Sequence, residues 1–265
     1  MKKQPILPVL FAIMLIVFAA GCSKEFSSSG YKAPGKADDS FNLRINFTPV
    51  FDTVKLSFDS TYTNFWKEPF SVSAFKFYVC KFDLINTDSG TVYHINPEKY
   101  FLIDAADSTS WAVKLASKPF RYNRISFLIG VDSIRNVSGA QTGALDPTKA
   151  MFWTWNSGYI MAKLEGNSPL SSIANNKIEY HIGGFAGPEN VLRKPTLLFP
   201  FGQFSEIVAD KKSIISINAN VGAWFYNPHQ IKIKETPSCT TPGLMAKDIS
   251  ENYSKMFTVT AIVNN

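Results

Sequence analysis

Two tryptophans, two methionines and a histidine carry the most distinctive chemistry in this sequence. Met151, Trp153 and Trp155 are spaced by two, and Met161 and His181 follow them. On a β-strand, residues spaced by two share a face. A buried indole needs a partner for its N–H, and thioethers are soft, polarisable groups. These residues therefore form either an aromatic core strand or a redox-active pocket that accepts a metal.

Two further candidate site residues, Asp132 and His181, each have a structural and a functional interpretation. A strand predicted at 124–130 leads into a loop that contains Asp132. Asp132 either shapes an Asx turn or supplies a carboxylate ligand. His181 lies between Tyr180 and Ile182, so it is either a core histidine bonded to the backbone or a metal ligand.

Short strand signals separated by turn residues dominate the rest of the chain. The turn at 86–90 predicts a hairpin, and 243–256 is the one good helix candidate. We predict an all-β fold, an antiparallel β-sandwich or barrel-like sandwich with one short C-terminal helix. The expected strands are 41–47, 75–84, 91–95, 100–103, 124–130, 159–164, 178–182, 195–201, 213–218 and 257–263.

The N-terminus has the order of a secretory signal. Lys2 and Lys3 precede an apolar run that ends in small residues before Cys22, as in the lipobox of bacterial lipoproteins. We expect residues 1–21 to be a signal peptide and Cys22 to be acylated. Residues 22–40 are polar and predict a flexible tether, which leaves 41–265 as a single β domain.

Several function classes lack sequence support. The basic residues behind the formal charge of +6 are scattered, so we expect no nucleic-acid partner. The sequence has no phosphate-binding glycine loop, His-Glu-x-x-His or Gly-x-Ser-x-Gly motif. We therefore expect a protein that is not an enzyme. Cys80 and Cys239 either pair or remain buried thiols, because their spacing has no signature.

Five motifs in order resemble a known family. They are Gly130-Val-Asp-Ser, Gly143-Ala-Leu-Asp-Pro147, Met151-Phe-Trp-Thr-Trp-Asn-Ser-Gly-Tyr159, Leu164-Glu-Gly166 and Tyr180-His-Ile-Gly-Gly184. Together they are similar to the MbnP-like family of bacterial periplasmic copper-binding proteins, in particular its lipoprotein branch. The resemblance spans roughly 41–263.

This resemblance implies a β-sandwich, a copper cofactor and a dihaem cytochrome c peroxidase-like partner. In the family's characterised branch, that partner oxidises a tryptophan to kynurenine, which helps to hold copper. Here the implied target is Trp153 or Trp155. His181 falls on the family's His-x-Gly position, and Met151 and Met161 become supporting ligands.

One loop departs from the family pattern. Copper-binding members carry a histidine next to an asparagine after the Gly-Val strand, whereas this chain reads Arg135-Asn136-Val137. A second ligand then has to come from His94, His229, a methionine or Asp132.

Two functional hypotheses follow. The first is a periplasm-facing lipoprotein, anchored in the outer membrane through lipid on Cys22, that binds copper and takes part in copper acquisition or handling. The second is a non-catalytic β-sandwich interaction module of the cell envelope that holds no metal.

Overall fold

The computed structural model describes residues 41–153, 158–208 and 211–264, which fall within one compact unit, Asp39–Asn265. The predicted signal peptide and tether, with Cys22, lie outside the described residues, as does Trp155. Within the described ranges, no helix has the length and apolarity needed to cross a bilayer.

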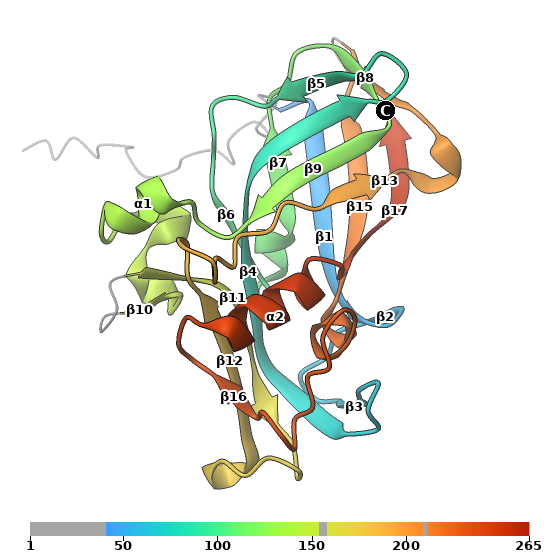
Figure 1. The fold of residues 1–265 in the computed structure, drawn as a ribbon. Helices are drawn as coiled ribbons and strands as arrows, with labels where there is room; N and C mark the ends of the chain where they lie inside the picture. The colour runs from blue at the N-terminus through green and yellow to red at the C-terminus, as the bar shows by residue number, and fades with distance from the viewer. Residues whose placement is uncertain (1–40, 154–157, 209–210, 265) are drawn as a thin grey trace, which may run out of the picture. The chain divides into compact units, whose positions relative to one another are not determined.

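Strands account for most of the regular structure in the described residues (Figure 1). The two α-helices are α1 (Ser133–Val137) and α2 (Leu244–Tyr253), and the 3₁₀ turn η6 spans Val221–Phe225. The strands are β1 (Leu43–Phe51), β2 (Val54–Lys55), β3 (Thr61–Thr63), β4 (Pro69–Asn86), β5 (Thr91–His94), β6 (Phe101–Asp104), β7 (Ala112–Leu115), β8 (Phe120–Tyr122), β9 (Arg124–Ile129), β10 (Phe152–Trp153), β11 (Gly158–Asn167), β12 (Lys177–Gly183), β13 (Thr196–Leu198), β14 (Ser205–Ile207), β15 (Ser213–Asn220), β16 (Ser238–Cys239) and β17 (Phe257–Asn264).

The long strand β4 organises the larger sheet. In the described chain this sheet has ten strands, in the order β13-β9-β4-β11-β12-β16, with β3, β5 and β6 also paired to β4 and β10 paired to β11. Figure 1 shows β4 running from β3 at one end to β5 at the other. Its register with β9 shifts between Cys80 and Asp83, where Lys81 has a φ of 49°. This irregularity is typical of a β-bulge, which bends a strand.

A smaller sheet packs against the larger one through aromatic side chains. In the described residues it has the order β17-β15-β1-β2, with β7 paired to β1. Leu43, Ile45 and Phe47 alternate with less buried residues along β1, as a half-buried strand requires. The Phe47 ring makes edge-to-face contacts with Phe77 of β4 and Phe127 of β9, at centroid distances of 6.1 and 5.3 Å. These contacts form the sandwich core.

The predicted all-β class and C-terminal helix are confirmed. The hairpin around 86–90 is β4–β5, and the predicted helix is α2. Two parallel pairings, β1 with β15 and β12 with β16, occur in a sandwich that is otherwise antiparallel in the described registers.

The two cysteines of the domain do not pair. Cys80 and Cys239 are free and buried. Burial raises the pKa of Cys80 to about 12 and that of Cys239 to about 11, so both are inert thiols at neutral pH.

Candidate functional site

The outward face of the larger sheet carries a row of charged residues. Lys163 of β11 lies opposite His181 of β12 on one side and Lys76 of β4 on the other. Lys76 lies opposite Asp104 of β6 and forms a 2.9 Å ion pair with it. Residues directly opposite each other in neighbouring strands share a face. The structure therefore places His181 in a polar cross-strand row.

Glu165 links His181 to Lys163. Its Oε1 lies 2.6 Å from Nε2 of His181 and 3.2 Å from Nζ of Lys163. The hydrogen bond with His181 lowers the pKa of Glu165 to about 2, with help from the Lys163 charge and against the opposing effect of partial burial. Glu165 is thus ionised at neutral pH, and the pair offers one nitrogen and one oxygen donor on the same patch.

Trp153 lies beside this pair because Gly183 leaves room for it. A Cβ at Gly183 would lie 2.4 Å from Cζ3 and 2.5 Å from Cη2 of the indole. Gly183 follows His181 by two residues on β12, so both positions face the same side of the strand. The buried indole therefore occupies the space next to His181 that a larger residue at 183 would fill.

A pocket of about 310 Å³ borders the indole. Trp153 lines it together with Asn136 and Val137 of α1 and with Phe185. Within the described part of the chain, its lining contains no histidine, cysteine or carboxylate. The C-terminal residues of α1 thus line the same pocket as the indole.

A β-bulge in β11 separates Met161 from His181. Ile160 pairs with Gly183 and Ala162 pairs with Ile182, so the register shifts at Met161. Both Met161 and Ala162 then lie opposite Ile182. Met161 is fully buried, and its Sδ accepts a hydrogen bond from the backbone N–H of Val131 at 3.1 Å.

Met151 is also a buried residue of the core. It has no exposed surface, and its carbonyl accepts a 2.9 Å hydrogen bond from the N–H of Ile160. Both thioethers are therefore enclosed by the fold, whereas the imidazole of His181 is 19% exposed.

Asp132 is the N-cap of α1. Its carboxylate accepts a hydrogen bond from the N–H of Arg135 at 3.1 Å, another from the hydroxyl of Tyr100, and an ion pair from Lys81 at 3.1 Å. Burial favours the neutral acid, but these three interactions outweigh it and lower the pKa of Asp132. In the described structure its oxygens are engaged by this network, as in the Asx-type interpretation.

Asn136 fastens the α1 loop to β11. Its Oδ1 accepts a hydrogen bond from the N–H of Tyr159 at 2.9 Å, and its Nδ2 donates to the carbonyls of Val131 and Asp132. The side chain is 1% exposed. This amide holds the loop against the strand that follows the tryptophan segment, which fixes one wall of the pocket.

The three histidines have different carboxylate partners. His94 pairs with Asp83 at 2.7 Å and His229 pairs with Glu251 at 2.6 Å, whereas His181 pairs with Glu165.

Sequence reasoning missed Glu165, Lys163 and Gly183 as parts of the site. Glu165 lies just beyond the predicted strand 159–164, whereas β11 continues to Asn167. A longer predicted strand would have placed Lys163 and Glu165 on one face. The register that places Lys163 opposite His181, and so brings Glu165 within reach of the imidazole, was not readable from one strand.

The fold is a β-sandwich that places an imidazole, a carboxylate and a buried indole at one sheet face. The model of the MbnP family matches residues 40–241, and the chain belongs to that family. Among solved structures, MbnP from Methylosinus trichosporium is similar, with a TM-score of 0.45 and 12% identity, covering 76% of this chain and 82% of that one. No curated protein matches the chain.

Proposed function

We propose that this chain is a periplasm-facing lipoprotein that binds copper at the Trp153–His181 face and takes part in copper acquisition or handling. The observation that carries the proposal is the placement of the Trp153 indole on Gly183, two residues from His181 and on the same face. Family membership supports it. The role is binding, not catalysis.

Two side chains at this face can act as copper ligands. His181 supplies an imidazole nitrogen and Glu165 an ionised carboxylate oxygen 2.6 Å away, a set that fits Cu(II) better than Cu(I). Lys163 shares the same carboxylate oxygen, so its ammonium has to move aside when a cation binds. An indole in its native form adds no ligand, because its ring nitrogen carries a proton and has no free lone pair.

The missing donor is supplied, in this proposal, by oxidation of a tryptophan. In this conversion of Trp153 or Trp155, two equivalents of peroxide cleave the indole C2–C3 bond, each giving up one oxygen atom and leaving as water. Hydrolysis of the resulting N-formyl group releases formate and gives kynurenine, whose aryl amine and ketone both have lone pairs. The sequence has no haem or flavin motif of its own, so the catalyst of the peroxide step is a dihaem cytochrome c peroxidase-like partner. Acylation of Cys22 anchors the chain in the outer membrane, facing that partner.

Copper binding is tested on processed protein purified from its native host. We expect copper by elemental analysis, a kynurenine within the peptide 150–163 by mass mapping, and copper uptake that is lost in H181Q. The matched control is H94Q, since His94 also pairs with a carboxylate but is 70% exposed and lies on β5. Native protein that has no copper and takes up none, with both tryptophans intact, contradicts the proposal.

A metal-free interaction module is the second candidate, and a separate observation favours it. The short helix α1 exposes Ile134 (71%) and Val137 (72%), and Val137 lines the pocket beside Trp153. Exposed apolar residues beside a pocket are typical of a protein contact. In this case, substitution of both Ile134 and Val137 by serine abolishes binding of a protein partner. Copper uptake is then the same in the double variant and in wild type, whether or not wild type takes up copper.

A further inference from the structure

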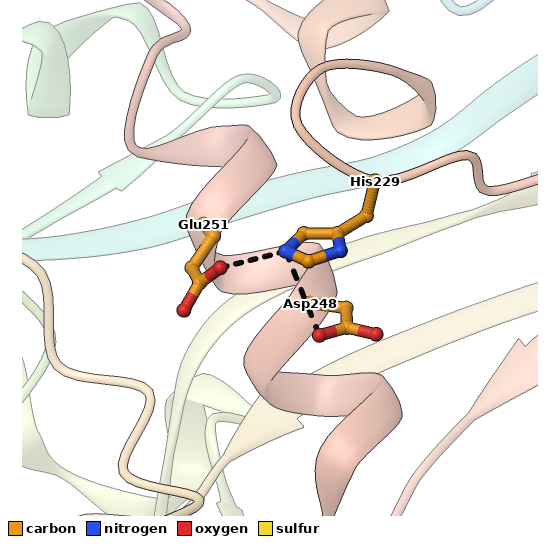
Figure 2. A group of neighbouring side chains, drawn as sticks. All are labelled: His229, Asp248 and Glu251. Atoms are coloured by element: carbon orange, nitrogen blue, oxygen red, sulfur yellow. Dashed lines mark hydrogen bonds and ion pairs between the residues drawn. The ribbon is translucent and has the colours of Figure 1, made fainter.

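A second group of possible metal ligands combines one histidine, His229, with two carboxylates of α2. His229, Asp248 and Glu251 place one ligand atom each within 4.8 Å of one another. Nε2 of His229 lies 2.6 Å from Oε2 of Glu251 and 3.6 Å from Oδ1 of Asp248 (Figure 2). In Figure 2 both carboxylates project from α2 toward the same edge of the imidazole ring.

The helix sets the two carboxylates. Asp248 and Glu251 are three residues apart on α2, which puts them on one face of the helix. Their side chains are 23% and 31% exposed. Solvent can therefore reach the group and complete a coordination sphere.

A buried asparagine sets the histidine. The backbone N–H of His229 donates to Oδ1 of Asn252 at 2.9 Å. Nδ2 of Asn252 donates to the backbone carbonyls of His229 and Trp224 at 2.8 and 3.0 Å. Asn252 belongs to α2 and has no exposed surface. The backbone of His229 is thus tied to the same helix that carries both carboxylates, which holds the three ligands in a common frame.

The charges around Glu251 leave one of its oxygens for the histidine side. Lys247 and Arg193 approach Oε1, at 2.7 and 3.4 Å, whereas His229 faces Oε2. A carboxylate held through its second oxygen is the usual arrangement around a metal ligand.

We propose that His229, Asp248 and Glu251 bind a borderline divalent transition-metal ion, with zinc as the reference ion, at a site separate from the Trp153–His181 face. Two ligand atoms of a tetrahedral zinc ion lie about 3.3 Å apart, given bond lengths of about 2.0–2.1 Å. The 3.6 Å separation of His229 and Asp248 is close to this value, and the 2.6 Å separation of His229 and Glu251 has to open by roughly 0.7 Å.

The ligand set selects the ion. Calcium takes six to eight oxygen ligands and magnesium keeps an octahedral oxygen shell, whereas this group offers an imidazole and two carboxylates, one of them shared with two cations. Three protein ligands and one water match the zinc sites that keep an open position. Binding cross-links the turn that carries His229 to α2.

The test uses processed full-length protein without a histidine tag, in the H181Q background, so that the proposed copper face does not contribute. Zn²⁺ is titrated by calorimetry, and Co²⁺ absorption reports the coordination geometry. We expect one site, a thermal midpoint that rises with Zn²⁺, and affinity at least about tenfold weaker in H181Q/H229Q and in H181Q/D248N, because loss of even an outer-sphere partner costs about 10- to 100-fold.

The control is H94Q/H181Q, which keeps the proposed ligands and has to bind like H181Q. D248N changes one partly exposed side chain to a neutral residue of the same size, so it remains informative if H229Q fails to fold. The proposal is overturned if H181Q binds no Zn²⁺ at millimolar concentration, or if folded D248N binds as tightly as its parent. Loss of copper uptake in H181Q tests the Trp153–His181 face only. Its outcome does not affect the zinc result at His229, Asp248 and Glu251.

Discussion

Substitution of Gly183 by alanine tests how the indole is held beside His181. The added Cβ would lie 2.4 and 2.5 Å from two carbons of Trp153 and 3.0 Å from the carbonyl oxygen of Tyr159. Carbon atoms in favourable contact are about 3.5–4.0 Å apart, so the ring has to retreat by roughly 1 Å or more. Its 6% exposure leaves little free space for that movement.

Two limits bracket the loss in the free energy of unfolding. Overpacking a core by one methyl group costs about 1–3 kcal/mol. Ejecting a tryptophan that buries up to about 250 Å² would cost up to about 6 kcal/mol at 25 cal/mol per Å². Because tilting the ring costs less than exposing it, we expect a destabilisation of about 2 kcal/mol.

A double-mutant cycle isolates the clash. Urea unfolding of wild type, G183A, W153A and the double variant is followed by far-ultraviolet circular dichroism. In the W153A background the added methyl group meets no ring and only the 3.0 Å contact with the Tyr159 carbonyl oxygen remains, so the cost of G183A should fall clearly below its cost in wild type. If G183A is as stable as wild type, or if the two substitutions are additive, the inferred contact between Gly183 and Trp153 is wrong.

Two further substitutions test the same sheet. E165Q removes the shared partner of His181 and of Lys163, which is 7% exposed. The pKa of Glu165 is lowered from 4.5 to about 2, so its contribution is present above 4.5 and lost as pH falls toward 2. Thermal midpoints measured from pH 5 to pH 2 should therefore converge for wild type and E165Q, and a constant gap contradicts this account. G166A places a Cβ 1.8 Å from the carbonyl oxygen of Ser71, and we expect loss of soluble folded protein or destabilisation above about 3 kcal/mol; a stable G166A variant would show that the β4–β11 register is wrong.

The longer strands were predictable from sequence because their periodicity is local. The short strands β2, β3, β7, β8, β14 and β16 were not among those expected. Alternation along β1 and the turn between β4 and β5 gave both elements directly. The parallel pairing of β1 with β15 was not predictable, because alternation shows which face is buried and not which strand lies alongside. The helix α1 was missed because five residues are too short for a helical period to appear, although Asp132 is a typical N-cap.

The candidate site was only partly predictable, because residue types are visible in the sequence but the pairing of strands is not. His181 and Trp153 stood out by residue type, and both lie at one sheet face. Glu165 did not stand out, because its role depends on the β11–β12 register, which brings Lys163 opposite His181. Long-range register is fixed by packing of the whole sheet, and a single strand does not contain it.

The bulge in β11 explains why Met161 and His181 do not come together. With unbroken alternation, Met161 would share a face with Lys163, and hence with His181 opposite it. The structure instead places two residues, Met161 and Ala162, opposite Ile182, which turns the thioether toward Gly130 and the backbone N–H of Val131. Because that thioether is enclosed and bonded, the proposed copper site would draw on His181, Glu165 and an oxidised tryptophan, and not on Met161.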